Sequence, residues 1–319
     1  MKLTVSLAVR TTTTVSLKCS KANGDGSPWQ GMIMDKSKVV FKIFVVFDFI
    51  IFAIMAAVVL LMWLALGFND LGTRLAFCFV ISLIITTLVI VVGVGRAFNS
   101  QLYKLQCDMV KEFEANGYSD KFFEIADQGV GLCSDKPRDL PFLKTFVYNA
   151  TECAIFHDDP NLALQYMMHI DRDMVDKKAA SFVDDGQSAV TYFGAQMLIC
   201  VAKGDKARGS NVIEDAKPYF EKYYGKRPII DLIIDKAYAN YYYLIEDDEK
   251  TKEYAMKVSG NSVYRAKNMI SSEILLAKME RRRGNTERVD ALMNVAEWIA
   301  KRHPSAISQQ CIDRFYQSR

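Results

Sequence analysis

The stretch IIDLIIDKAYANYYYLIEDDEK, residues 229–250, decides the fold class of this chain. Its apolar residues recur at helical intervals, and the run YANYYYLI continues that stripe instead of alternating as a strand does. Asp247 and Asp248 follow, where acids cap the free amides of a new helix and suit the positive end of its dipole. The stretch therefore predicts a helix, a short polar turn and a second helix.

Short polar turns of this kind recur between long amphipathic segments. They fall at Asn116-Gly117, Asp158-Asp159, Gly204-Asp205, Asp247-Asp248 and Gly284-Asn285. Neighbouring turns are about 40 residues apart, within the period of roughly 34 to 47 residues that helical solenoids use. No segment from residue 96 to 319 shows sustained strand alternation. We therefore expect residues 98–319 to form an all-α domain of repeated helical hairpins.

In two of these units a turn glycine is followed twelve residues later by an alanine in the second helix: Gly204 by Ala216 and Gly284 by Ala296. These two units resemble the tetratricopeptide repeat family, which joins paired helices by a glycine-containing turn and packs a small alanine in the second helix. The units that begin at Asp158 and Asp247 carry Ile170 and Ser259 at the same offset, and the family's proline is out of register at Pro304. The resemblance implies an α-solenoid that binds protein or peptide on a concave surface, and other α-solenoid families remain open.

Two long apolar runs precede this domain: FIIFAIMAAVVLLMWLALGF, residues 49–68, and LAFCFVISLIITTLVIVVGVG, residues 75–95. Each run reaches the roughly 20 apolar residues that cross about 30 Å of hydrocarbon. A pair of buried core helices is the alternative, but core helices seldom run so long without charge. The sequence therefore predicts a transmembrane hairpin over residues 39–97, with spans at about 43–68 and 75–95 and a tight turn between them.

The orientation of the hairpin follows from its basic residues. Lysines and arginines lie before the first span and after the second, at Lys36, Lys38, Lys42, Arg96, Lys104 and Lys111, against Arg74 alone in the turn. Because basic residues remain on the inner side of a membrane, both termini should be cytoplasmic, in a plasma or cell membrane. Residues 1–38 lack periodicity and should be disordered. The segment is weakly similar to an organellar transit peptide, and the alternative is that translation starts after it begins, at Met32 or Met34.

Asp48 is the one acid inside the first span, about one turn from its start. An antiparallel partner would bring Arg96 to a similar depth, so Asp48 and Arg96 are candidates for an intramembrane pair. Ala53 and Ala57 form a small-residue pair that suits helix association, including a homo-oligomer through the membrane helices. A proton or ion path through such oligomers is the alternative interpretation of Asp48.

The composition excludes several functions. A formal net charge of +3 gives no basic footprint for nucleic acid. The seven scattered cysteines fit a reducing compartment, and His157, His169 and His303 have no third ligand beside them in the sequence. No nucleotide, hydrolase or metalloprotease motif occurs. We therefore expect neither a cofactor nor a metal, and we expect the chain not to be an enzyme.

The remaining candidates are residues for partner binding. Tyr238, Tyr241 and Tyr242 can line a peptide groove or fill the core, and Arg281, Arg282 and Arg283 can bind acidic partners or end a helix. The sequence predicts a membrane-anchored protein–protein adaptor whose partners are the lipid bilayer and an unknown protein or peptide. A membrane-bound enzyme with a site assembled from distant residues and an oligomeric transport or pore element are the alternatives.

Overall fold

The computed structural model describes residues 48–57, 79–88, 101–134, 139–176 and 186–318. These residues fall into two compact units, one comprising residues 48–57, 79–88 and 101–104 and the other beginning at residue 105. The predicted N-terminal segment, the turn between the spans, most of both spans and Arg96 lie outside the described residues. Within the described residues, no helix combines the length and the apolar character needed to cross a bilayer.

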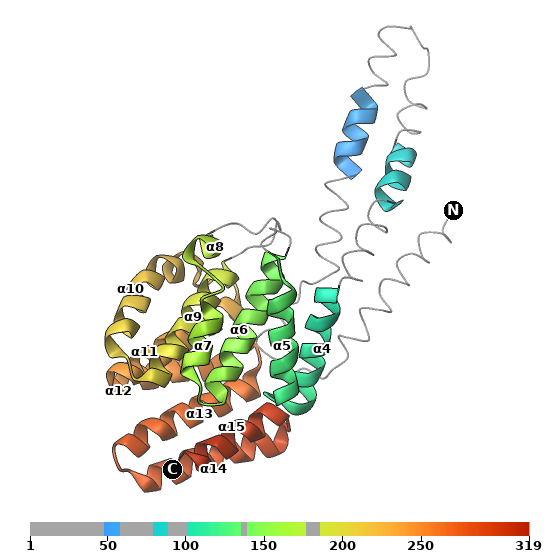
Figure 1. Cartoon of the computed structure of the whole chain (residues 1–319). Coiled ribbons are helices and arrows are strands. Elements are labelled where there is room, and N and C mark those ends of the chain that lie inside the picture. The colour runs from blue at the N-terminus through green and yellow to red at the C-terminus, as the bar shows by residue number, and fades with distance from the viewer. Residues whose placement is uncertain (1–47, 58–78, 89–100, 135–138, 177–185, 319) are drawn as a thin grey trace, which may run out of the picture. The chain divides into compact units, whose positions relative to one another are not determined.

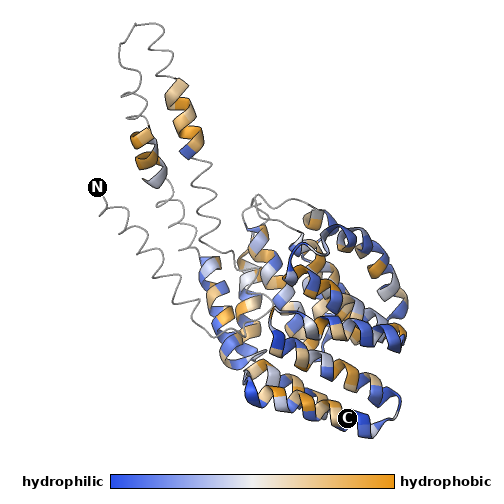
Figure 2. Cartoon of the chain, turned by 180° about the vertical axis from the view of Figure 1, so that it is seen from behind, coloured by the Kyte–Doolittle hydropathy of each residue, from blue (hydrophilic) through white to orange (hydrophobic). Residues whose placement is uncertain are grey.

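The first unit contains two short helices, residues 48–57 and 79–88, which pack against each other (Figure 1). The Asp48 carboxylate accepts hydrogen bonds from the Ser82 hydroxyl at 3.2 Å and from the Thr86 hydroxyl at 3.4 Å. The rings of Phe52 and Phe79 meet edge to face, with centroids 5.7 Å apart. Polar groups thus lie between the helices, and large apolar side chains of both helices are exposed. Figure 2 shows both helices as mostly hydrophobic.

The second unit is built from helices, and its described residues include no strand. Its first helix, α4, begins at Gln101 in the first unit and continues into the second. The helices are α4 (Gln101–Asn116), α5 (Asp120–Leu132), α6 (Leu140–Phe156), α7 (Pro160–Met167), α8 (Arg172–Asp176), α9 (Gln187–Lys203), α10 (Lys206–Tyr223), α11 (Pro228–Ile245), α12 (Asp248–Gly260), α13 (Arg265–Arg282), α14 (Thr286–Arg302) and α15 (Ala306–Gln317).

Successive helices of this unit pair as antiparallel hairpins. Helix α6 packs on α7, α9 on α10, α11 on α12 and α13 on α14, and each hairpin packs on the next (Figure 1). Phe193, Phe220 and Ile230 are among the buried residues that join α9, α10 and α11. The prediction of an all-α arrangement of helical hairpins is confirmed for the part of the chain described.

Four hairpins close with the same turn. A residue with positive φ ends the first helix, namely Asp158, Gly204, Glu246 or Gly284, at φ of 59°, 65°, 65° and 76°. The next residue is Asp159, Asp205, Asp247 or Asn285, and its side chain accepts a backbone amide three residues later. The left-handed residue satisfies the last carbonyls of one helix and the acid or amide caps the next, so one two-residue signal reverses the chain.

This geometry corrects one detail of the predicted repeat. The left-handed residue of the third turn is Glu246, one position before the predicted Asp247. The residue equivalent to the packed alanines Ala216 and Ala296 is therefore Val258 and not Ser259. Val258 is 3% exposed and both alanines are 0% exposed, so this position is buried in all three units.

The shared turn allows a paired test of backbone strain. Alanine at Gly204 would meet no atom within 4 Å but would hold φ near +65°, so we expect Gly204→Ala to lower the free energy of unfolding by about 1 kcal/mol. Glycine at Glu246 removes the same strain, so Glu246→Gly should raise the melting temperature although it breaks an exposed ion pair with Lys206. Thermal unfolding followed by circular dichroism measures both changes. Shifts of the same sign would contradict a common left-handed turn.

The C-terminal helix returns to the start of the unit. The Gln310 side chain on α15 donates to the Asn116 carbonyl at 2.8 Å and accepts from the Tyr118 amide at 3.0 Å. Arg314 donates to the Ile155 carbonyl at 2.8 Å and forms an ion pair with Asp158. Helix α15 thus joins the turn after α4 to the end of α6, and the first and last helices of the array lie together.

Candidate functional site

The predicted tyrosines lie on α11 and face the second helices of the hairpins. The Tyr238 ring stacks near Tyr242 and Tyr254, with centroids 6.1 and 5.0 Å away, and lies 5.5 Å from Phe220 on α10. Burial raises the pKa of Tyr238 to about 12. The Tyr241 hydroxyl lies 3.4 Å from Ser210 on α10. These rings therefore fill the seam between α10, α11 and α12, and their role in partner binding remains a prediction.

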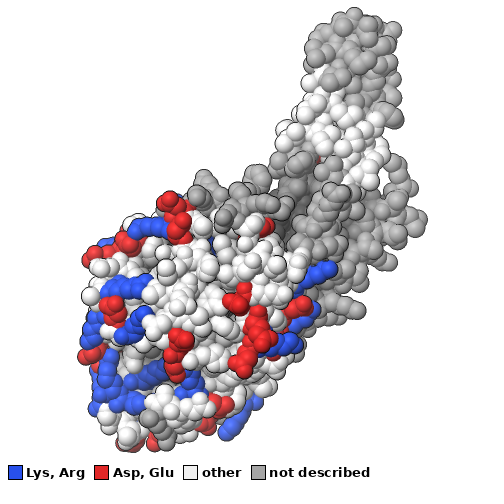
Figure 3. All heavy atoms as spheres, viewed as in Figure 1, with Lys and Arg blue, Asp and Glu red and all other residues white. Residues whose placement is uncertain are grey.

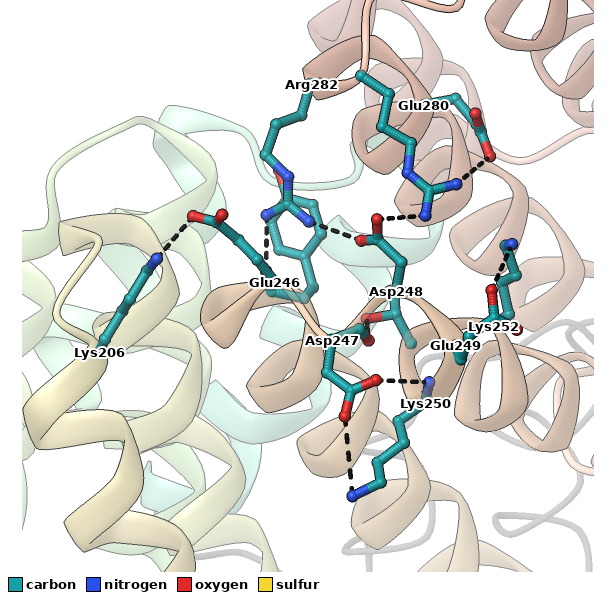
Figure 4. A network of polar contacts seen from close by, with 12 residues as sticks. Lys206, Glu246, Asp247, Asp248, Glu249, Lys250, Lys252, Glu280 and Arg282 are labelled. Carbon is teal, nitrogen blue, oxygen red and sulfur yellow. Dashed lines mark hydrogen bonds and ion pairs between the residues drawn. The ribbon is translucent and has the colours of Figure 1, made fainter.

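Two of the predicted arginines belong to a polar network at the ends of α11, α12 and α13 (Figure 4). Arg282 donates to the Asp248 carboxylate at 2.8 Å and to the Tyr243 carbonyl at 2.9 Å. Arg283 reaches the other oxygen of Asp248 at 2.5 Å and Glu280 at 3.5 Å. The Asp248 side chain is only 17% exposed, so the arginines clamp the start of α12 onto the end of α13.

Arg281 makes a different contact. Its guanidinium lies 3.6 Å from the centroid of the Phe315 ring and donates to the Phe315 carbonyl at 3.0 Å. It thereby holds α15 against α13. All three arginines thus have intramolecular partners, and their binding of an external partner remains a prediction.

The structure brings together a group of titratable side chains that the sequence did not single out. We call it the inner cluster, and it consists of Tyr118, Glu152, Lys236, Lys267, Lys278, Cys311 and Arg314. Its members come from the turn after α4 and from helices α6, α11, α13 and α15. They meet because α15 bonds back to the first hairpins.

Lys267 and Lys278 share one face of α13. A separation of eleven residues is about three helical turns, which places the two side chains in line and about 16 Å apart along the helix. Lys236 on α11 lies near Lys267, and Arg314 on α15 lies near Lys278, since Lys236 lowers the pKa of Lys267 and Arg314 lowers the pKa of Lys278. The inner cluster therefore has two positive poles at opposite ends of this face.

The first pole has unusual electrostatics. Burial and the neighbouring Lys236 lower the pKa of Lys267 to about 8, and burial also lowers the pKa of Lys236. The Lys267 ammonium lies 4.7 Å from the centroid of the Phe113 ring, whose face attracts a cation. Glu152 opposes the repulsion, but it already accepts the Tyr118 hydroxyl at 2.5 Å. Burial beside this carboxylate raises the pKa of Tyr118 well above its usual value, so the hydroxyl remains a donor.

The second pole is more open. Lys278 is more exposed than Lys267, yet partial burial of its ammonium and the neighbouring Arg314 lower its pKa. Cys311 lies between the poles, and the cations Lys267, Lys278, Arg314 and Lys236 all act on its thiol. Burial outweighs these cations and raises the pKa of Cys311, so the thiol is neutral at pH 7.

The histidines His157 and His169 follow the ends of α6 and α7. His157 contacts the Tyr118 carbonyl through Nε2 at 3.1 Å and lines a shallow pocket with Asp158, Asp313 and Arg314. Asp158 in this pocket is ion-paired to Arg314. His169 is exposed at the end of α7. Among the described residues, no group of three His, Cys, Asp or Glu side chains is placed to hold a metal ion.

The outer surface differs from the inner cluster in its distribution of charge. On the face seen in Figure 3, acidic and basic side chains are interspersed around a broad uncharged area. Such mixed charge is ordinary for a surface that faces water.

Comparison of the chain with family models, with curated proteins and with solved structures gives no match. The inner cluster and the two short helices are therefore the features of the molecule that bear on its function.

Proposed function

We propose that this chain is a membrane-anchored adaptor, held in a bilayer by residues 39–97 and presenting a tetratricopeptide-like solenoid to a cytoplasmic protein or peptide. The observation that supports the anchor is the inverted polarity of the two short helices. Ser82 and Thr86 are 0% exposed and bond to Asp48 between the helices. Phe49 and Ile54 point outward with exposures of 71% and 60%.

This polarity is the reverse of what water favours. A helix pair in water buries its large apolar side chains, whereas a pair in lipid exposes them and keeps its polar groups inside. The lipid-facing surface also includes Ile84 and Leu88, 55% and 60% exposed. The apolar sequence that continues past both described helices supports the same environment.

The solenoid supports the adaptor function through the inner cluster. Partner-binding repeat proteins use the surface formed where successive hairpins stack. In this chain that surface carries the cations Lys236, Lys267 and Lys278 on neighbouring hairpins. The predicted homo-oligomer is compatible with this function, because association through the membrane helices would leave the solenoids free to bind partners.

Thiol labelling in cells tests the anchor and its orientation. In a chain whose native cysteines are replaced, an impermeant reagent should label Asp70→Cys in intact cells because the turn lies outside. Lys111→Cys and Ser318→Cys should react only after the cells are opened.

Carbonate washing of membranes tests the anchor separately. The double variant Ile54→Lys with Ile84→Lys should be released from carbonate-washed membranes, whereas the control Ser82→Ala should stay bound. Recovery of the unmodified chain in the carbonate supernatant would reject the anchor.

A further inference from the structure

We propose that the inner cluster binds an extended acidic peptide segment whose acidic groups lie about five residues apart, one at each positive pole. This inference rests on the proposed adaptor function and names the chemistry of its partner.

The charge balance of the inner cluster leaves room for an anion. Among the described residues, no ion pair joins an acid to Lys236, Lys267 or Lys278. Arg314 is the member of the cluster with a bound acid, Asp158, and Glu152 is engaged by Tyr118. Two lysines that repel each other in a partly buried place do not stabilise a fold. An anion bound between them would relieve the repulsion, and a site that awaits an anion explains why both are present.

The spacing of the poles selects the kind of anion. The backbones of Lys267 and Lys278 are about 16 Å apart along α13, which is more than one phosphate or carboxylate spans. An extended chain advances about 3.3 Å per residue, so five residues cover that distance. A peptide with two separated acids therefore fits the cluster better than one small anion does.

The surface between the poles suits a peptide. Asn240 and Ser271 are half-buried polar residues one turn after Lys236 and Lys267 on the same helix faces. Each side chain donates to the carbonyl of that lysine at 2.9 Å and keeps an oxygen that can accept a peptide amide. Cys311 lies between the poles as a neutral thiol that is still partly accessible. A peptide that spans both poles would cover this thiol, which provides a readout independent of affinity.

Fluorescence anisotropy with the full chain in detergent micelles tests the proposal. The probes are labelled hexapeptides with glutamates at the first and last positions, the same peptide with glutamines, and a peptide with two adjacent glutamates. We expect the spaced diacid to bind best and to weaken as salt is raised. Lys267→Met and Lys278→Met should each lower its affinity about tenfold, consistent with loss of one charge contact. Lys267→Arg, which keeps the charge, should retain most binding, and Lys301→Met on exposed α14 should change nothing.

The thiol and a small anion complete the test. With the other cysteines replaced, the spaced peptide should slow modification of Cys311, and inorganic phosphate should compete only at high concentration. Equal binding of the glutamine peptide, equal binding by the Lys267→Met and Lys278→Met variants, or phosphate binding as tight as the peptide would overturn the proposal.

Failure of the peptide site and failure of the adaptor are separable. If the full chain captures a consistent partner from membranes and Lys267→Met with Lys278→Met captures it equally well, the adaptor stands and the peptide site is wrong. If the spaced peptide binds but the chain leaves carbonate-washed membranes, the peptide site stands and the anchor is wrong.

Discussion

Gly129→Ala should destabilise the helical unit by about 2 to 3 kcal/mol, the cost of overpacking a rigid core. A Cβ atom at position 129 on α5 would lie 2.4 Å from two atoms of the Phe146 ring on α6. Phe146 is 0% exposed, so its ring cannot swing into solvent to make room. Helix propensity alone favours alanine over glycine by about 1 kcal/mol, so a net loss must come from packing. Urea unfolding followed by circular dichroism measures the change.

Gly131 provides the matched control on the same helix. A Cβ atom there meets nothing within 4 Å, so Gly131→Ala should be neutral or slightly stabilising. Adding Phe146→Leu to Gly129→Ala should recover part of the lost stability, because the smaller side chain yields space to the new methyl group. Equal effects of the two alanine substitutions would show that α5 and α6 do not approach as closely as described.

Lys267→Met should stabilise the unit by about 1 to 2 kcal/mol at pH 7. The pKa of Lys267 falls from its ordinary 10.5 to about 8 in the folded chain, and each unit corresponds to about 1.4 kcal/mol. We expect less than the full value because the side chain is partly accessible and contacts Phe113. Methionine fills a similar volume without the charge. A rise in stability together with a loss of peptide binding would mark a residue retained for function.

The pH dependence gives this prediction a sign. Between about pH 8 and 10.5 the unfolded chain binds more protons at Lys267 than the folded chain does, so this lysine makes stability rise with pH. The gain from Lys267→Met should therefore be largest below pH 8 and shrink as pH increases. Lys236, Glu152, Cys311 and Tyr118 face the same place and remain in both chains, so the difference between the two chains reports Lys267.

Lys257 is the control for this experiment. Its pKa is raised, chiefly by a hydrogen bond to Glu253, so Lys257→Met removes a favourable charge. We expect a change within about 0.5 kcal/mol and no gain. A loss of stability in Lys267→Met at pH 7 would contradict the cost assigned to its buried charge.

The hairpin architecture followed from local signals, because a helical stripe and a capped turn are both readable over a few residues. The third turn was misplaced by one residue because Asp247 caps the following helix, while the left-handed position before it belongs to Glu246, a residue that seldom adopts positive φ. The position of the packed alanine shifted with it. Local chemistry thus located the repeats, and backbone geometry set their register.

The candidate site was less predictable, because it depends on which side of each helix meets which neighbour. Tyr238 and Tyr242 were predicted to line a groove or to fill the core, and in the fold they pack against Phe220 and Tyr254. Lys236 and Lys267 gave no signal, since a lysine in an amphipathic helix is ordinary. Lys236 and Lys267 become part of a cluster because α15 bonds to the first hairpins, and no local sequence pattern predicts a contact between residues this far apart.

The contact of α15 with the turn after α4 also sets the order of folding steps during synthesis. The bond between Tyr118 and Gln310 joins residues separated by 192 positions, so the first helices leave the ribosome well before their last partner exists. At about 5 to 20 residues per second, the delay is roughly 10 to 40 s. During this time the hairpins can form and stack, because their contacts are local, while the turn after α4 still lacks its bond to α15. A partner present at the ribosome would thus meet an array whose ends are not yet joined.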